Sequence, residues 1–298
     1  MHRTPLLSSR SLGERIGALA FLKAESLQRT GSFKVRGAVY AVGALSAAER
    51  AGGIVTMSAG NHAAAVAYAA RSYGARVVVA MPETAPATKV AATRAQGAEI
   101  RFASDTTKLM PIVDELREAG FRFVHPWDDV IPGTGTIGLE ILDDLPAADL
   151  VVVPVGGGGL IAGIATAVRA RRPGARIIGV QPEGAAAMRR SLDAGTPIRL
   201  ERVETIADGC TAPSVGTIAL EIVQRLVDDV VVIPDDAIRE GLRFVFERAR
   251  LVVEPAGAVA VAALLCGAVP VRPGERVAVV LSGGNIDVAR LADLLAPR

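Results

Sequence analysis

Residues 150–172 read LVVVPVGGGGLIAGIATAVRARR, an apolar run followed by four glycines and a second, alanine- and isoleucine-containing segment. The run from Leu150 to Val155 has the length and β-branched content of a buried strand, and the segment from about Leu160 has the length of a helix. Consecutive glycines at such a junction let backbone amides approach an anion without interference from Cβ atoms, and the helix dipole adds attraction. The sequence therefore predicts a phosphate site at Gly156, Gly157, Gly158 and Gly159.

The same pairing of a short β-rich run with a longer helical segment recurs along the chain. The other runs lie at 52–58, 75–82, 176–182 and 276–282, and helical segments follow the first three at 62–74, 88–97 and 185–195. Strands that alternate with helices form parallel sheets with helices on both faces. The predicted fold class is therefore α/β with mostly parallel sheets.

The composition argues against several kinds of partner. Of 298 residues, 50% are apolar, 21% are charged and 4% are aromatic, and the formal net charge is +2. The chain has no basic stripe and no base-stacking platform, so we do not expect it to bind nucleic acid. We also find no signal-peptide core and no span for a membrane. Because Cys210 and Cys266 lie far apart, the cytoplasm is the expected compartment.

The glycine run also fits a different phosphate-binding pattern. Gly157, Gly159 and Ala162 satisfy the loose dinucleotide motif G-x-G-x-x-G/A. That motif requires an acidic residue at the end of the next strand to bind a ribose, and here the strand ends at Gln181. A nucleotide-binding dehydrogenase is therefore the weaker alternative.

The segment TGSFKVRGA, residues 30–38, carries a second chemical signal. Lys34 is one of only four lysines among 33 basic residues. Ser32 is expected to cap the helix that follows, which places Lys34 in its first turn, where the dipole disfavours a positive charge. The pKa of the Lys34 amine is therefore expected to be lowered, and imine chemistry needs a neutral amine. Taken alone, a lysine in a first turn is more often a solvated surface residue.

Six segments of the chain resemble the motifs of one enzyme family. They are GSFKVRGA (31–38), SAGNHA (58–63), VGGGGL (155–160), TIADG (205–209), EPAGA (254–258) and SGGN (282–285). In this order they are similar to the serine/threonine dehydratases and serine racemases, which belong to the tryptophan-synthase-β-like, or fold type II, enzymes of pyridoxal 5′-phosphate (PLP). The resemblance implies a large PLP-binding domain of residues 1–51 and 127–298, a small inserted domain of residues 52–126, and an active site in the cleft between them.

The resemblance also implies a role for each motif. Lys34 would hold PLP covalently and, once the substrate displaces it, take the proton from the substrate Cα as the catalytic residue. The substrate carboxylate would bind at Ser58, Ala59, Gly60, Asn61 and His62, of which Asn61 would also contact the cofactor and His62 would be held by packing. The other expected cofactor contacts are Phe33, Gly156, Gly157, Gly158, Gly159, Leu160, Gly209, Glu254 and Ser282.

Two positions favour one activity over the others. Ser282 would contact the ring nitrogen of the cofactor, and a hydroxyl cannot keep that nitrogen protonated by charge pairing, which favours loss of a β-substituent. Serine racemases usually carry a second serine where this chain has Ala59, and a methyl group cannot shuttle a proton. We therefore predict a dehydratase, or ammonia-lyase, that converts L-threonine, L-serine or a related 3-hydroxy amino acid to a 2-oxo acid and ammonia. Serine racemase and a β-replacement synthase are the alternatives within the fold.

Two further expectations concern metal and assembly. Several members of the family bind a divalent cation through carboxylates after the fourth strand of the large domain. This chain has Gln181, Ala185 and Ala187 at the matching positions, so no metal site is expected. We expect the protein to form a homodimer. Its expected small-molecule partner is an amino-acid substrate.

Overall fold

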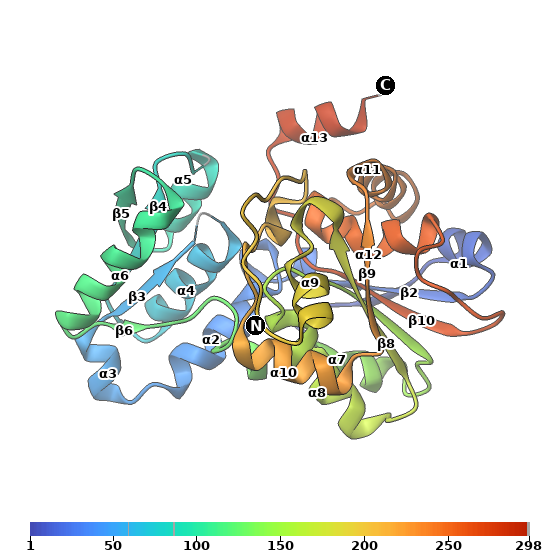
Figure 1. The fold of residues 1–298 in the computed structure, drawn as a ribbon, viewed down its shortest axis with the longest axis horizontal. Coiled ribbons are helices and arrows are strands. Elements are labelled where there is room, and N and C mark those ends of the chain that lie inside the picture. The colour runs from blue at the N-terminus through green and yellow to red at the C-terminus, as the bar shows by residue number, and fades with distance from the viewer. Residues whose placement is uncertain (59, 86, 297–298) are drawn as a thin grey trace. The chain divides into compact units, whose positions relative to one another are not determined.

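The computed structural model of the chain describes residues 1–58, 60–85 and 87–296 (Figure 1). It divides into two compact units, a larger one of residues 2–33 and 134–298 and a smaller one of residues 34–133 together with Met1. The smaller unit extends beyond residues 52–126 at both ends. The domain boundaries expected from the sequence stay a prediction.

The larger unit contains a six-stranded sheet built from both ends of the chain. In order across the sheet, its strands are β1 (Leu6–Ser8), β2 (Leu19–Ala24), β10 (Arg276–Leu281), β7 (Leu150–Pro154), β8 (Arg176–Pro182) and β9 (Asp229–Ile233). The strands β1 and β2 are antiparallel, and all other neighbours are parallel. Figure 1 shows β2 beside β10, which pair along their whole lengths although they come from opposite ends of the sequence.

Alternate residues of the central strands explain why helices cover both faces of this sheet. Leu150 and Val152 of β7 belong to one buried cluster, and Val151 and Val153 belong to another. A strand that is apolar on both sides buries both sides only between two layers of helices. The helices are α1 (Arg10–Ile16), α7 (Ile131–Asp144, which begins in the smaller unit), α8 (Gly159–Arg171), α9 (Ala187–Ala194), α10 (Thr217–Leu226), α11 (Asp235–Phe244), α12 (Pro255–Leu265) and α13 (Val288–Leu295).

Short helical turns complete the larger unit. They are the 3₁₀ turns η1 (Glu25–Leu27), η2 (Arg29–Gly31), η4 (Glu183–Ala185) and η5 (Asp208–Cys210), and the π-helical segment η6 (Val245–Ala249). Of the two layers, α12 lies in the cluster that contains Leu150, and α8 lies in the cluster that contains Val151. The cluster around α12 is also packed by α11, because Gly241 allows the two helices to approach closely.

The smaller unit repeats this design around a four-stranded parallel sheet. In order, its strands are β5 (Glu99–Ala103), β4 (Val77–Pro82), β3 (Ile54–Met57) and β6 (Arg122–Phe123). Val79 of β4 packs in one buried cluster and Val78 in another. The helices are α2 (Lys34–Ala44), α3 (Ala47–Gly52), α4 (Asn61–Ser72), α5 (Ala87–Ala95), α6 (Leu109–Glu118) and the 3₁₀ turn η3 (Thr106–Lys108).

These elements match the α/β pattern expected from the sequence. Within the described residues, no helix combines the length and the hydropathy that are needed to cross a bilayer. Within each sheet, the parallel strands have their carboxyl ends at the same edge, where loops that bind ligands collect in such folds.

Candidate active site

The glycine run connects β7 to α8 through a backbone that glycine adopts readily. Gly158 is the N-cap residue of α8 with φ of +98°, and no side chain caps that helix. A Cβ atom on Gly158 would lie 2.5 Å from Cε of Met188 and 2.9 Å from Cβ of Ala219. Since the N–H groups in the first turn of a helix have no acceptor within the helix, the uncapped start of α8 is able to bind a phosphate group.

Four residues expected to contact the cofactor lie together at the start of α12. A Cβ atom on Gly156 would lie 3.4 Å from the carbonyl oxygen of Gly209, and one on Gly209 would lie 3.6 Å from Oε1 of Glu254. Ser282 is 4% exposed, and its hydroxyl donates to the carbonyl oxygen of Ala256 at 3.2 Å. The larger unit thus brings the glycine loop and the TIADG, EPAGA and SGGN segments together.

Glu254 is the N-cap residue of α12, and Pro255 follows it at the first helical position. Its side chain forms no capping hydrogen bond, although Glu254 is only 2% exposed. The side chain of Glu254 therefore does not cap the helix that it precedes. Its carboxylate instead lies beside Gly209.

Lys34 is the first residue of α2, as the sequence predicted, but Ser32 does not cap the helix. Ser32 is extended, with φ of −160° and ψ of 162°, and forms a β-bridge with Gly283. The N–H of Phe33 donates to the carbonyl oxygen of Ser282 at 3.0 Å. Because the SGGN segment holds Ser32 extended and accepts the N–H of Phe33, the helix begins after these two residues. Oγ of Ser32 has no partner among the described residues.

The side chain of Lys34 contacts a segment that the sequence analysis did not select. Its amine donates to the carbonyl oxygen of Pro126 at 3.2 Å. Pro126 lies within HPWDD (125–129), which is separated from the end of β6 by one residue. This segment contains the only tryptophan of the chain, Trp127. Because ligands bind near the carboxyl ends of parallel strands, the position of this segment after β6 could have marked it as part of the site.

The residues expected to bind the substrate carboxylate connect β3 to α4. The N–H of Gly60 donates to Oγ of Ser58 at 3.0 Å, and Gly60 is the N-cap residue of α4, which has no side-chain cap. Asn61 is the first residue of that helix, and Ala59 lies outside the described residues. Nζ of Lys89 lies 3.6 Å from the position that a Cβ atom of Gly60 would take. Lys89 therefore brings a positive charge to this loop, a feature that the sequence analysis missed.

His62 is buried in the smaller unit and is held by polar contacts as well as packing. Its Nε2 lies 3.0 Å from Oγ1 of Thr56, which itself donates to the carbonyl oxygen of Val124 at 2.9 Å. The Thr56 oxygen therefore accepts from a protonated Nε2. Burial, followed by the nearby charge of Lys34, holds the pKa of His62 well below its usual value. The ring is neutral, and the group that His62 would offer to an anion is its backbone N–H.

Gln181 also contributes to the glycine loop in a way that the sequence did not reveal. It is fully buried at the end of β8. Its Nε2 donates to the carbonyl oxygen of Ala185 at 3.2 Å and lies 3.5 Å from that of Gly156, and its Oε1 accepts from the N–H of Arg189 at 2.9 Å. This one amide therefore links the first glycine of the loop to the segment between β8 and α9.

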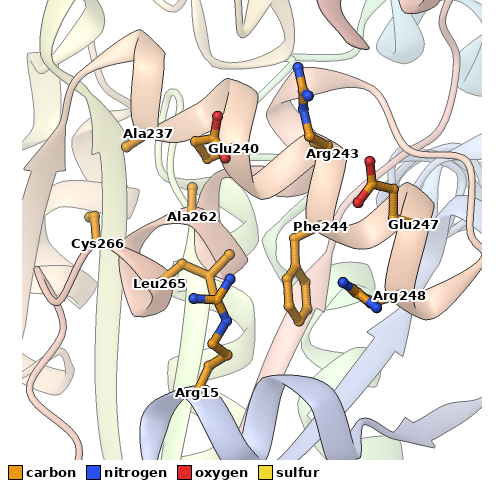
Figure 2. Close-up of a pocket in the computed structure, with 10 residues that line it drawn as sticks. All are labelled: Arg15, Ala237, Glu240, Arg243, Phe244, Glu247, Arg248, Ala262, Leu265 and Cys266. Carbon is orange, nitrogen blue, oxygen red and sulfur yellow. The ribbon is translucent and has the colours of Figure 1, made fainter. Parts of the chain in front are cut away.

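A separate hollow of about 340 Å³ opens in the larger unit (Figure 2). Figure 2 shows Arg15 reaching into it from α1, opposite residues of α11, η6 and α12. Its lining consists of Arg15, Ala237, Glu240, Arg243, Phe244, Glu247, Arg248, Ala262, Leu265 and Cys266. None of these is among the expected site residues.

Comparison with known proteins identifies the class of enzyme. The family model described as pyridoxal-phosphate dependent enzyme matches residues 1–283. The chain therefore belongs to the family of PLP-dependent enzymes. The nucleotide-binding dehydrogenase considered as an alternative is thereby wrong.

Individual relatives narrow the class further. The chain is 44% identical over 298 residues to the L-threonine ammonia-lyase of Thermotoga maritima, covering 97% of this chain and 72% of the relative. It is 42% identical over 299 residues to the catabolic L-threonine dehydratase of Escherichia coli, covering 99% and 91%. The structure of maize serine racemase is similar with a TM-score of 0.94 and 37% identity, covering 98% and 91%. These findings confirm the predicted fold type, the cofactor PLP and the predicted enzyme class, a PLP-dependent lyase.

Proposed function

We propose that the chain is an ammonia-lyase of 3-hydroxy amino acids that acts on L-threonine and L-serine. The observation that carries the proposal is the buried hydroxyl of Ser282 at the start of α12, in the same cluster as the glycine loop. A neutral partner does not keep a pyridine nitrogen protonated, so the cofactor withdraws electrons less strongly and loss of a β-hydroxyl is favoured. The similarity to two proteins named for threonine elimination supports this assignment.

The residues present fit the cofactor. The uncapped start of α8 suits a phosphate group, and the φ of +98° at Gly158 is a conformation that residues with a Cβ atom rarely adopt. The hydroxyl of Ser282 can rotate from Ala256 toward a ring nitrogen, because a serine O–H is free to turn about its Cβ–Oγ bond. When bound, PLP draws electrons from the substrate Cα and makes its C–H bond acidic.

The chain's own groups would then perform three tasks. Lys34 would hold the cofactor covalently and, after its release, accept the proton from Cα at Nζ. The hydroxyl of Ser58 and the amides at the start of α4 would bind the substrate carboxylate, with Lys89 adding positive charge nearby. Overall, Cα would lose a proton and Cβ would lose its hydroxyl group, which together make one water molecule. One water molecule would be taken up when ammonia departs, so L-threonine would yield 2-oxobutanoate and ammonia.

The competing activity within the fold is serine racemization. The similarity to maize serine racemase favours testing it. We propose that the chain is a dehydratase rather than a racemase because Ala59 has no proton to transfer from the second face of the cofactor. Racemization of serine should therefore be slower than its deamination.

A substrate panel tests the proposal directly. The PLP-loaded protein is incubated with L-threonine, L-serine, threo-3-hydroxyaspartate and phenylserine, and ammonia and 2-oxo acid are measured together with the D/L ratio of remaining serine. We expect equal amounts of the two products, with the highest rate on L-threonine or L-serine, and loss of both in Lys34→Ala. Interconversion of L- and D-serine that exceeds ammonia release, or products that appear only when sulfide is added, would contradict the assignment.

We further propose that the enzyme is a cytoplasmic homodimer with a PLP-binding domain of residues 1–51 and 127–298 and an inserted domain of residues 52–126. Both cysteines, Cys210 and Cys266, are free thiols, which suits a reducing compartment. Light scattering coupled to size exclusion measures the mass of the PLP-loaded protein. A mass near one chain of 30.8 kDa rather than twice that value would refute the dimer.

A further inference from the structure

The segment His125–Asp129 of the smaller unit forms a turn that is tied together by one side chain. Nδ1 of His125 accepts from the N–H of Trp127 at 3.4 Å and from the N–H of Asp128 at 3.2 Å. The N–H of His125 donates to Oδ2 of Asp129 at 2.8 Å. The turn is therefore closed from both sides, by the imidazole over its start and by the carboxylate at its end.

These contacts define the state of the imidazole. Because Nδ1 accepts two hydrogen bonds, the proton of the neutral ring is on Nε2. Burial lowers the pKa of His125; Asp128 and Asp129 oppose this effect, and Lys34 adds to it. The ring is an uncharged acceptor, and it lies edge-on to Phe123 and Trp127 with ring centroids 5.7 and 5.4 Å away.

The same turn supplies a hydrogen-bond partner of Lys34. The carbonyl oxygen of Pro126, which is a buried residue, accepts from Nζ of Lys34 at 3.2 Å. A neutral amine that donates one N–H to a fixed carbonyl has fewer orientations open to its lone pair. The orientation of the Lys34 amine therefore depends on how firmly residues 125–129 are held.

We propose that His125 is a positioning residue for Lys34. Its imidazole locks the turn as a hydrogen-bond acceptor, and the locked turn places the Pro126 carbonyl against the Lys34 amine. The proposal rests on the proposed function, since it assumes that Lys34 holds the cofactor and moves the Cα proton. What it adds is that the ring of His125 acts through Pro126 and not by exchanging a proton itself.

The matched variants are His125→Asn and His125→Ala, studied in the PLP-loaded full chain. The side-chain oxygen of asparagine accepts backbone N–H groups of the following residues, so His125→Asn keeps the closing bonds while removing the imidazole. We expect kcat of His125→Ala to fall by about tenfold to hundredfold, as for a misplaced catalytic group, and KM to change by less than about threefold. His125→Asn should stay within about threefold of the wild type in both parameters.

A measurement without substrate separates positioning from a general loss of activity. PLP is added to the cofactor-free protein, and attachment to Lys34 is followed by borohydride trapping and mass spectrometry of the labelled peptide. We expect attachment to slow by about tenfold in His125→Ala and to remain normal in His125→Asn. His2→Ala, which replaces an exposed histidine of the larger unit, is the control and should leave the rate unchanged.

The outcomes decide between the possible roles of the ring. If folded His125→Asn has a kcat and a PLP attachment rate as low as those of His125→Ala, the imidazole itself takes part and the positioning role is wrong. The positioning role is also wrong if His125→Ala matches the wild type in both measurements. Should His125→Ala fail to fold, Asp129→Ala opens the same turn from its other side and must show the same selective loss of kcat. If the wild type attaches no PLP at Lys34, the proposed function fails and the positioning role fails with it, whereas a working wild type with unaffected variants refutes the positioning role alone.

Discussion

Replacing Gly158 with alanine perturbs the proposed phosphate loop at its tightest point. The residue has φ of +98°, a conformation that costs an L-residue with a Cβ atom about 1–2 kcal/mol. The new Cβ would also lie 2.5 Å from Cε of Met188 and 2.9 Å from Cβ of Ala219, and overpacking of this kind costs about 1–3 kcal/mol. We therefore expect the free energy of unfolding to fall by about 2–5 kcal/mol. The shift needed to admit the methyl group should also weaken PLP binding by about tenfold or more, because it displaces the amides at the start of α8.

Urea unfolding followed by far-UV circular dichroism measures the stability term, and titration of the cofactor-free protein with PLP measures the binding term. Gly267→Ala is the matched control, because Gly267 has φ of +76° but no atom within 4 Å of its added Cβ. It should cost only the backbone term of about 1–2 kcal/mol and leave PLP affinity unchanged. Equal destabilisation of the two variants, or normal PLP affinity in Gly158→Ala, would refute the reasoning that crowding at this loop sets its anion-binding geometry.

Substitutions at Lys34, Lys89 and His62 and removal of divalent cations test the other parts of the proposed site. Lys34→Ala should lower ammonia release by about 10²–10⁴-fold, the range for loss of an acid–base group, and should prevent borohydride labelling; a normal rate of elimination would contradict the proposed mechanism. Lys89→Met should raise KM by about tenfold with little change in kcat, whereas the exposed Lys108→Met should change neither, and an equal effect of both would remove Lys89 from the carboxylate site. The pKa of His62 is lowered in the folded protein, so below about pH 6.5 the unfolded chain binds a proton that the folded chain does not. The free energy of unfolding therefore decreases as the pH is lowered, and urea melts of His62→Gln should show a shallower decrease. The buried amide of Gln181 occupies a position at which several members of the family are expected to have a cation-binding carboxylate. Ammonia release should therefore survive dialysis against EDTA. A loss of ammonia release that magnesium restores would show a metal site.

The parts of the fold that were predictable depend on local patterns. Apolar runs such as 150–155 and 276–282 are buried on both faces, so their sequences alone distinguish them from half-exposed strands. The glycines that follow Val155 are likewise local, since a sharp strand-to-helix junction needs residues without Cβ atoms. These signals were sufficient for the α/β class, and the phosphate loop stays a prediction.

Ser32 shows where local reasoning failed. A serine directly before an expected helix favours capping by its own side chain, which predicts a helix that begins at Phe33. A β-bridge to Gly283, from the far end of the chain, holds the backbone extended and moves the start of α2 beyond it. No pattern within the segment reports that competing interaction, because the partner is brought close only by folding.

By itself, the sequence determined the alternation of strands and helices, the glycine run after Val155, the segment that contains Lys34, and the similarity to PLP-dependent enzymes. Tertiary structure alone decided which carbonyl meets the Lys34 amine and how the amide of Gln181 comes to lie beside the carbonyl oxygen of Gly156. The physical reason is the separation along the sequence of the residues that interact. Helix and strand formation is governed by residues within a few positions of one another, whereas the partner of a buried polar group is any acceptor that folding brings within about 3 Å.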